Sequence, residues 1–73
     1  MKEEIIAGNK DINVDGWKVL EFESVFYDIE YEDNHLCYNV AYWRDGKIDE
    51  STEEFYDSEI IALNEYEINK END

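Results

Sequence analysis

The sequence predicts an α+β fold, in which a small antiparallel β-meander of three to four strands packs one face against a single C-terminal helix. Two patterns support the prediction: central segments alternate apolar and polar residues, and the last third carries apolar residues near helical spacing. The third observation is a set of two-residue turn signals: Asp15-Gly16, Asp33-Asn34 and Asp45-Gly46. We expect one domain over residues 1–73, with a disordered, solvated tail at about residues 69–73.

The first clear strand is the segment WKVLEFE, residues 17–23. Leu20 and Phe22 are apolar and alternate with Glu21 and Glu23, as expected of a strand with one buried face. The apolar parity then changes between Phe22 and Val25, which predicts a β-bulge near residues 23–24.

The clearest pattern is a predicted hairpin over residues 25–43, with Asp33-Asn34 as its turn. This register places four apolar pairs on one face: Tyr31–Leu36, Ile29–Tyr38, Tyr27–Val40 and Val25–Tyr42. A slip of one residue destroys the match, so we expect a well-specified register that forms the core.

Asp45-Gly46 predicts a second tight turn, followed by a short return strand around Ile48. Ser51 and Glu54 then fit a capping box, so a helix over residues 52–64 is the first choice. The alternative is a shorter helix followed by a strand over residues 60–68. The sequence leaves helix and strand open for residues 59–68.

The charge of the chain is extreme. The 21 acidic residues outnumber six basic ones, for a net charge of −15 and a pI near 4.1. We therefore do not expect direct binding to nucleic acid or to an anionic membrane, because both carry negative charge. Basic proteins and metal cations remain as partners. A single cysteine, Cys37, and no visible signal peptide or membrane segment predict a cytoplasmic protein.

Catalysis is not expected from this sequence. The chain has one His and one Cys, and it has no Gly-rich phosphate loop. One face of the predicted hairpin carries Glu30, Glu32, His35 and Cys37, a set that suits a cysteine nucleophile beside a base or a transition-metal site. A flat strand face, however, offers no walls to exclude water or hold a substrate, so we favour an exposed face with a weak Glu–His ion pair. We therefore predict a protein that is not an enzyme and that needs no cofactor.

One short segment resembles the first half of an EF-hand calcium loop. Its oxygen-bearing residues stand at alternate positions before a glycine: Asp11, Asn13, Asp15 and Gly16. The match then fails, because Phe22 stands at the twelfth position, where a bidentate Glu is required. We favour an Asp-Gly hairpin turn that brings Val14 opposite Trp17, and keep the metal site as a weak candidate.

The acidic residues themselves are the main candidate site. The first group lies on the predicted hairpin, and the second lies in the cation-poor stretch that follows. With one aromatic anchor, the predicted partner-binding residues are Asp28, Glu30, Glu32, Asp33, Asp49, Glu50, Glu53, Glu54, Asp57 and Trp43. A net charge of about 2–8 is enough to keep a small domain soluble, so the excess favours a charge-directed partner.

Two functions of different classes follow from this charge. The first is an acidic inhibitor, encoded by a phage or mobile element, that mimics nucleic acid and blocks the binding groove of a bacterial defence or DNA-processing protein. In size and charge the chain is comparable to phage-borne inhibitors of CRISPR effectors and restriction enzymes, although no motif matches those families. The second is a small acidic interaction or regulatory module without mimicry. A calcium-binding domain is a distant third.

Overall fold

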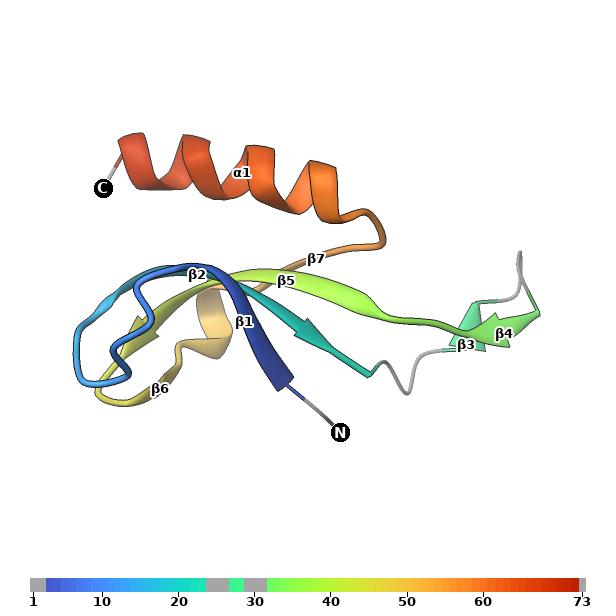
Figure 1. The fold of residues 1–73 in the computed structure, drawn as a ribbon, viewed down its shortest axis with the longest axis horizontal. Coiled ribbons are helices and arrows are strands. Elements are labelled where there is room, and N and C mark those ends of the chain that lie inside the picture. Colours follow the sequence, from blue (N-terminus) through green and yellow to red (C-terminus); the bar gives the residue numbers. More distant parts are fainter. Residues whose placement is uncertain (1–2, 24–26, 29–31, 73) are drawn as a thin grey trace.

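The structure is a computed structural model that describes residues 3–23, 27–28 and 32–72 of the chain. It confirms the predicted α+β fold, with an antiparallel sheet and one C-terminal helix on one face (Figure 1). The elements of the described residues are β1 (Glu3–Gly8), β2 (Gly16–Phe22), β3 (Tyr27–Asp28), β4 (Asp33–Asn34), β5 (Cys37–Arg44), β6 (Lys47–Ile48), the 3₁₀ helix η1 (Glu50–Thr52), β7 (Glu54–Tyr56) and α1 (Glu59–Glu71).

The centre of the sheet is the antiparallel pair of β2 and β5. Their register runs from Gly16 opposite Trp43 to Phe22 opposite Cys37. β1 covers the outer edge of β2, while β6 and β7 both pair with the other edge of β5. Both edges of β5 are thus occupied, and the sheet has five strands within the described part of the chain.

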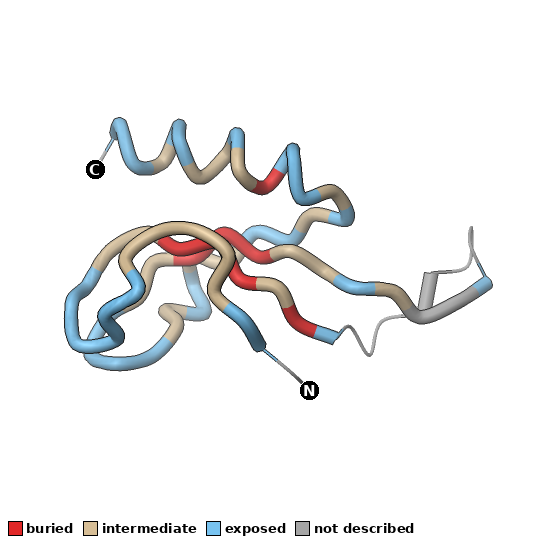
Figure 2. Tube along the Cα trace, viewed as in Figure 1, coloured by how far each residue is buried: buried red, intermediate tan, exposed pale blue. Residues whose placement is uncertain are grey.

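The core lies between the β2–β5 pair and α1. Val19, Val40 and Ala62 are fully buried there, with Tyr56 and Tyr66 among the side chains packed against them. Figure 2 shows the buried positions gathered on β2 and β5, with one on the helix. Side chains alternate along a strand, so the residues of β5 next to Val40 point away from the helix. We call this opposite side of the sheet the far face.

The predicted central hairpin over residues 25–43 is wrong in its pairing. Val40 pairs with Val19 and Glu54, whereas Tyr27 lies opposite Asn34 in the small β3–β4 pair. Asp33-Asn34 is strand β4 and not the turn. β2 offers β5 a ladder of seven residue pairs, so a long-range pairing overrode the local pattern. The predicted bulge near residues 23–24 falls partly outside the described residues.

The C-terminal helix begins later than predicted. Residues 50–52 form the 3₁₀ helix η1, β7 follows, and α1 starts at Glu59 after the N-cap Ser58. The alternative strand over residues 60–68 is also wrong, because that segment is helical. α1 continues through Glu71, so residues 69–71 belong to the helix and not to a disordered tail. The apolar spacing was helical, but the capping-box pattern at Ser51 marked the wrong start.

The two Asp-Gly signals have different outcomes. Asp45-Gly46 connects β5 to β6 with positive φ angles of 56° and 77°, which confirms the predicted tight turn. Asp15-Gly16 does not form a two-residue hairpin turn, because Gly8 pairs with Lys18 and residues 9–15 make a longer loop between β1 and β2. The predicted pairing of Val14 with Trp17 is therefore wrong.

Candidate partner-binding site

A pocket of about 470 Å³ lies on the far face. In Figure 1, α1 lies above the sheet, and β6 with the segment that follows it lies below. Strand alternation places Phe22, Asn39 and Trp43 on this lower side, because each is an odd number of residues from Val19 or Val40. We call this far-face pocket the acidic pocket. It is lined by Glu3, Phe22, Asn39, Trp43, Gly46, Lys47, Ile48, Glu50, Glu53 and Phe55.

Aromatic side chains make up much of the apolar lining of the acidic pocket. The rings of Phe22 and Phe55 meet edge to face, with centroids 5.8 Å apart. Phe55 is nevertheless 55% exposed, so part of its ring remains open to a partner. Trp43 is fixed by its indole Nε1, which donates a hydrogen bond to the carbonyl oxygen of Ile12 at 2.9 Å. The pocket therefore has aromatic walls whose positions are set by the sheet and by one loop.

Three carboxylates surround this apolar lining. Residues three apart lie on the same side of a 3₁₀ helix, so η1 brings Glu50 and Glu53 together, and β1 contributes Glu3. Burial raises the pKa of Glu53, and the negative charges of Glu50 and Glu3 raise it further. Among the described residues, none of the three has a cationic partner within 4 Å, although Lys47 lines the same pocket.

Asn39 is a buried polar residue in the lining. It is 2% exposed, and its Oδ1 has no hydrogen-bond partner among the residues that the structure describes. A buried acceptor without a donor costs roughly 1–3 kcal/mol, so such groups are uncommon in folded proteins. Asn39 therefore marks a place where a donor from outside the chain would improve the hydrogen bonding.

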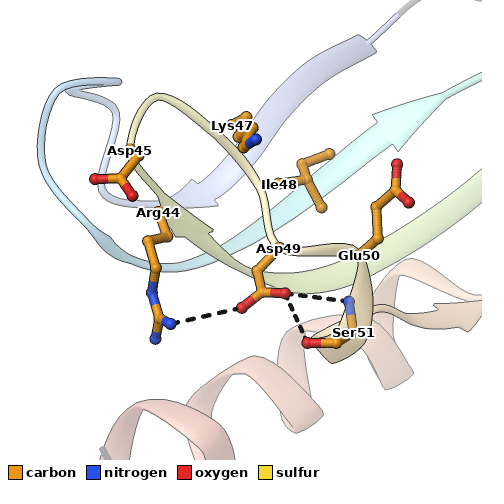
Figure 3. Close-up of a pocket in the computed structure, with 7 residues that line it drawn as sticks. All are labelled: Arg44, Asp45, Lys47, Ile48, Asp49, Glu50 and Ser51. Carbon is orange, nitrogen blue, oxygen red and sulfur yellow. Dashed lines mark hydrogen bonds and ion pairs between the residues drawn. The ribbon is translucent and has the colours of Figure 1, made fainter.

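A second pocket, of about 410 Å³, lies next to the first and shares Glu50, Lys47 and Ile48 with it. Figure 3 shows Asp49 in its centre, where Oδ1 accepts hydrogen bonds from the Ser51 backbone N–H at 3.2 Å and from the Ser51 hydroxyl at 2.6 Å. Asp49 also forms an ion pair with Arg44 at 3.9 Å. The hydrogen bonds from Ser51 lower the pKa of Asp49, with a smaller contribution from Arg44. Asp49 thus caps η1 and already has partners.

The loop over residues 9–15 contains the weak calcium candidate. Lys18 is fully buried, and its ammonium donates to the carbonyl oxygens of Asn9 and Asp11. Asp11 Oδ1 accepts from the Asn13 backbone N–H at 2.9 Å, and Asp15 Oδ1 accepts from the Asp45 backbone N–H at 2.9 Å. One carboxylate oxygen of Asp11 and one of Asp15 thus already accept hydrogen bonds from the protein's own donors. The described residues include no group of three His, Cys, Asp or Glu side chains arranged to hold a metal ion.

The structure separates the predicted partner-binding residues into groups. Trp43, Glu50 and Glu53 meet at the acidic pocket, whereas Asp49 is used as a cap. Glu54 pairs with Val40 and so projects from the sheet face that carries α1, and Asp57 is an exposed residue before the helix.

The predicted partner-binding residues of the hairpin that the structure describes are not among the lining residues of the acidic pocket. Glu30 lies outside the described residues. Asp28 and Asp33 lie opposite each other in the β3–β4 pair. Glu32 is an exposed turn residue with a φ of 53°. Glu32 therefore does not continue β3 as part of a straight strand row.

Sequence reasoning missed the other seven lining residues of the acidic pocket: Glu3, Phe22, Asn39, Gly46, Lys47, Ile48 and Phe55. Phe22 was placed in a strand, but the pairing that brings it to Phe55 is long-range and leaves no local signal. A usable signal existed for Asn39, which stands within the apolar run CYNVAYW. A polar residue inside a strand with two occupied edges is expected to be buried and to need a partner.

Comparison of the chain with protein-family models, curated proteins and solved structures finds no match. In the part of the chain that the structure describes, no helix has both the length and the apolar character needed to cross a membrane.

Proposed function

We propose that this protein is a non-catalytic acidic inhibitor that mimics nucleic acid. It binds the nucleic-acid-binding surface of a basic protein, such as a CRISPR effector or a restriction enzyme, and excludes the true ligand. The observation that carries the proposal is the net charge of −15, combined with a far-face pocket whose carboxylates lack a cationic partner among the described residues.

The charge of the acidic pocket opposes the stability of the fold. Burial raises the pKa of Glu53, and the negative charges of Glu50 and Glu3 raise it further, so the ionised Glu53 is unfavourable in the folded protein. Repulsion of this kind lowers the stability of a small domain and is offset when a cationic surface binds. Complementary charge also raises the rate of association with a basic partner. Salt screens this attraction, so binding should weaken steeply as the salt concentration rises.

The test begins with affinity capture from a nuclease-treated bacterial lysate. Three forms of the protein are compared: wild type, Glu50→Gln/Glu53→Gln at the acidic pocket, and Glu67→Gln/Glu71→Gln on exposed positions of α1. The two variants have the same net charge, so a difference between them reports position and not total charge.

The captured protein is then purified and loaded with fluorescently labelled DNA or RNA. The proposal predicts that wild type and the α1 variant displace the labelled nucleic acid, that the pocket variant does so weakly, and that displacement declines with rising salt. Simultaneous binding of nucleic acid and this protein contradicts mimicry and favours an interaction module of another kind. Capture of no nucleic-acid-binding protein also contradicts it.

A further inference from the structure

We propose that the acidic pocket binds the side chain of one arginine from the partner. The inference rests on the proposed function and assigns the residue type that it recognises. The juxtaposition that carries it is Asn39 opposite Phe55, with Trp43, Glu3, Glu50 and Glu53 in the lining of the same pocket.

The size and the walls of the pocket fit a side chain with an apolar stem. Its volume of about 470 Å³ lies in the range of ligand pockets, roughly 300–1,000 Å³. Phe22, Ile48 and Phe55 offer apolar surface for methylene groups, and aromatic rings also attract cations through their faces. Trp43 already does this inside the protein, where the Lys18 ammonium lies 4.9 Å from its ring centroid.

The charge of the pocket selects a cation. Three carboxylates and one ammonium, that of Lys47, line it, which leaves an excess of negative charge. Burial and the two neighbouring carboxylates raise the pKa of Glu53, so its ionised form is disfavoured there. A cation in the pocket relieves both effects.

Hydrogen bonding selects a ligand with several donors. Asn39 Oδ1 is an acceptor to which no described residue donates, and the carboxylates are acceptors as well. A guanidinium has five N–H donors in a rigid plane and can serve the amide and a carboxylate at once, whereas an ammonium is compact and strongly hydrated. Arginine is also the residue that nucleic-acid-binding proteins use most for bidentate contacts.

The test is an NMR titration of the isotope-labelled full chain with ethylguanidinium chloride, matched by ethylammonium chloride at equal ionic strength. The expected result is saturable movement of the Asn39 side-chain amide and Trp43 indole signals. Ethylguanidinium should bind about fivefold more tightly than ethylammonium. Asn39→Leu should weaken ethylguanidinium binding about tenfold, while the control Asn64→Leu on the exposed side of α1 leaves it unchanged.

Three results overturn the inference: shifts that spread over the acidic surface without saturating, equal affinity for the two probes, or unchanged binding by Asn39→Leu. If Asn39→Leu fails to fold, Glu50→Gln/Glu53→Gln takes its place, because Glu50 is exposed and Glu53 partly exposed. This variant must also lose ethylguanidinium binding, with Glu67→Gln/Glu71→Gln as its control.

The titration tests arginine binding and the displacement assay tests mimicry, so either proposal can be contradicted without the other. If ethylguanidinium does not bind in the pocket but nucleic acid is still displaced, the proposed function stands and arginine capture is wrong. If ethylguanidinium binds at Asn39 but no nucleic acid is displaced, the arginine pocket stands and mimicry is wrong.

Discussion

The loop over residues 9–15 and the acidic pocket are both polar surroundings on the far face, but they are completed differently. In the loop, the ammonium of Lys18 bonds to two backbone carbonyl oxygens and is fully buried. In the pocket, Asn39 Oδ1 and three carboxylates have no such cation among the described residues. Trp43 contributes to both, because its ring lies beside Lys18 and also lines the pocket.

This difference indicates a structural role for the loop, whereas for the pocket it supports the proposed role in binding. A polar site that the chain fills with its own cation holds the fold together, and the loop that resembled half a calcium site belongs to this kind. A polar site without a partner in the chain weakens the fold, because its groups are partly desolvated without compensation. Such a site is expected where an external ligand supplies the missing group. Substitutions in the loop should therefore change stability most, and substitutions in the acidic pocket should change binding most.

The largest expected effect is that of Lys18→Met. The substitution keeps the length of the side chain and removes the donor to Asn9 and Asp11, leaving two partly buried backbone carbonyl oxygens without this donor. We expect a loss of about 1–3 kcal/mol in the free energy of unfolding, measured by urea denaturation at pH 7. Lys10→Met, at an exposed position of the same loop, is the control and should change little. A Lys18→Met variant as stable as wild type would refute the structural role of this cation.

Phe55→Leu tests the pocket half of the contrast. Leu keeps apolar surface but removes the ring that pairs with Phe22 and faces a bound cation. We expect ethylguanidinium binding to weaken by about 0.5–1 kcal/mol, the size of an exposed cation–π interaction. Ile60→Leu, at the most exposed apolar position of α1, is the control. Equal binding by both variants would show that the ring has no part in recognition.

Glu53→Gln should increase stability, unlike most substitutions. A pKa raised in the folded state means that the folded protein favours the protonated carboxyl, so the ionised form destabilises the fold above that pKa. We expect a gain of roughly 0.5 kcal/mol at pH 7 that disappears when the pH falls below the unfolded-state pKa of Glu. Thermal unfolding of Glu53→Gln and of the exposed control Glu67→Gln between pH 3 and pH 8 measures it. A loss of stability at pH 7 would contradict the proposed repulsion.

Asp49→Ala should have the opposite pH dependence. The pKa of Asp49 is lowered by the hydrogen bonds from Ser51, so its contribution to stability is present above the unfolded-state pKa and is lost as pH falls through the folded-state value. We expect a modest decrease in melting temperature at pH 7 that narrows toward pH 2. An equal decrease at both pH values would show that the carboxylate charge has no role in capping η1.

The sequence was sufficient for the fold class, because local patterns specify it. The strand WKVLEFE, the Asp45-Gly46 turn and the helix-facing side of Tyr38, Val40 and Tyr42 were all readable from alternation and turn chemistry. Strand pairing was not, since Tyr27 and Val19 match Val40 equally well by pattern, and only the whole fold decides between them.

Only the part of the candidate site that lies within one stretch of the sequence was predicted. Glu50, Glu53 and Trp43 were found from charge and aromatic character, and they lie near one another in the chain. Glu3 reaches the same pocket because it pairs with Phe22 between β1 and β2, and Phe22 is placed there by the pairing of β2 with β5. Both pairings join residues that are far apart in the sequence, so no local pattern predicts them. Asp49 was predicted as a binding residue because its charge was visible, whereas its hydrogen bonds to Ser51 were not.

The most direct test of the central claim is amide hydrogen exchange of this protein, measured alone and bound to the captured partner. We expect slower exchange on binding in residues 45–56, which carry much of the acidic pocket and its rim, and unchanged exchange in residues 60–71 of α1. Protection confined to α1, where Ile60, Ile61 and Ile68 are exposed, would contradict it and place the partner on the opposite side of the sheet.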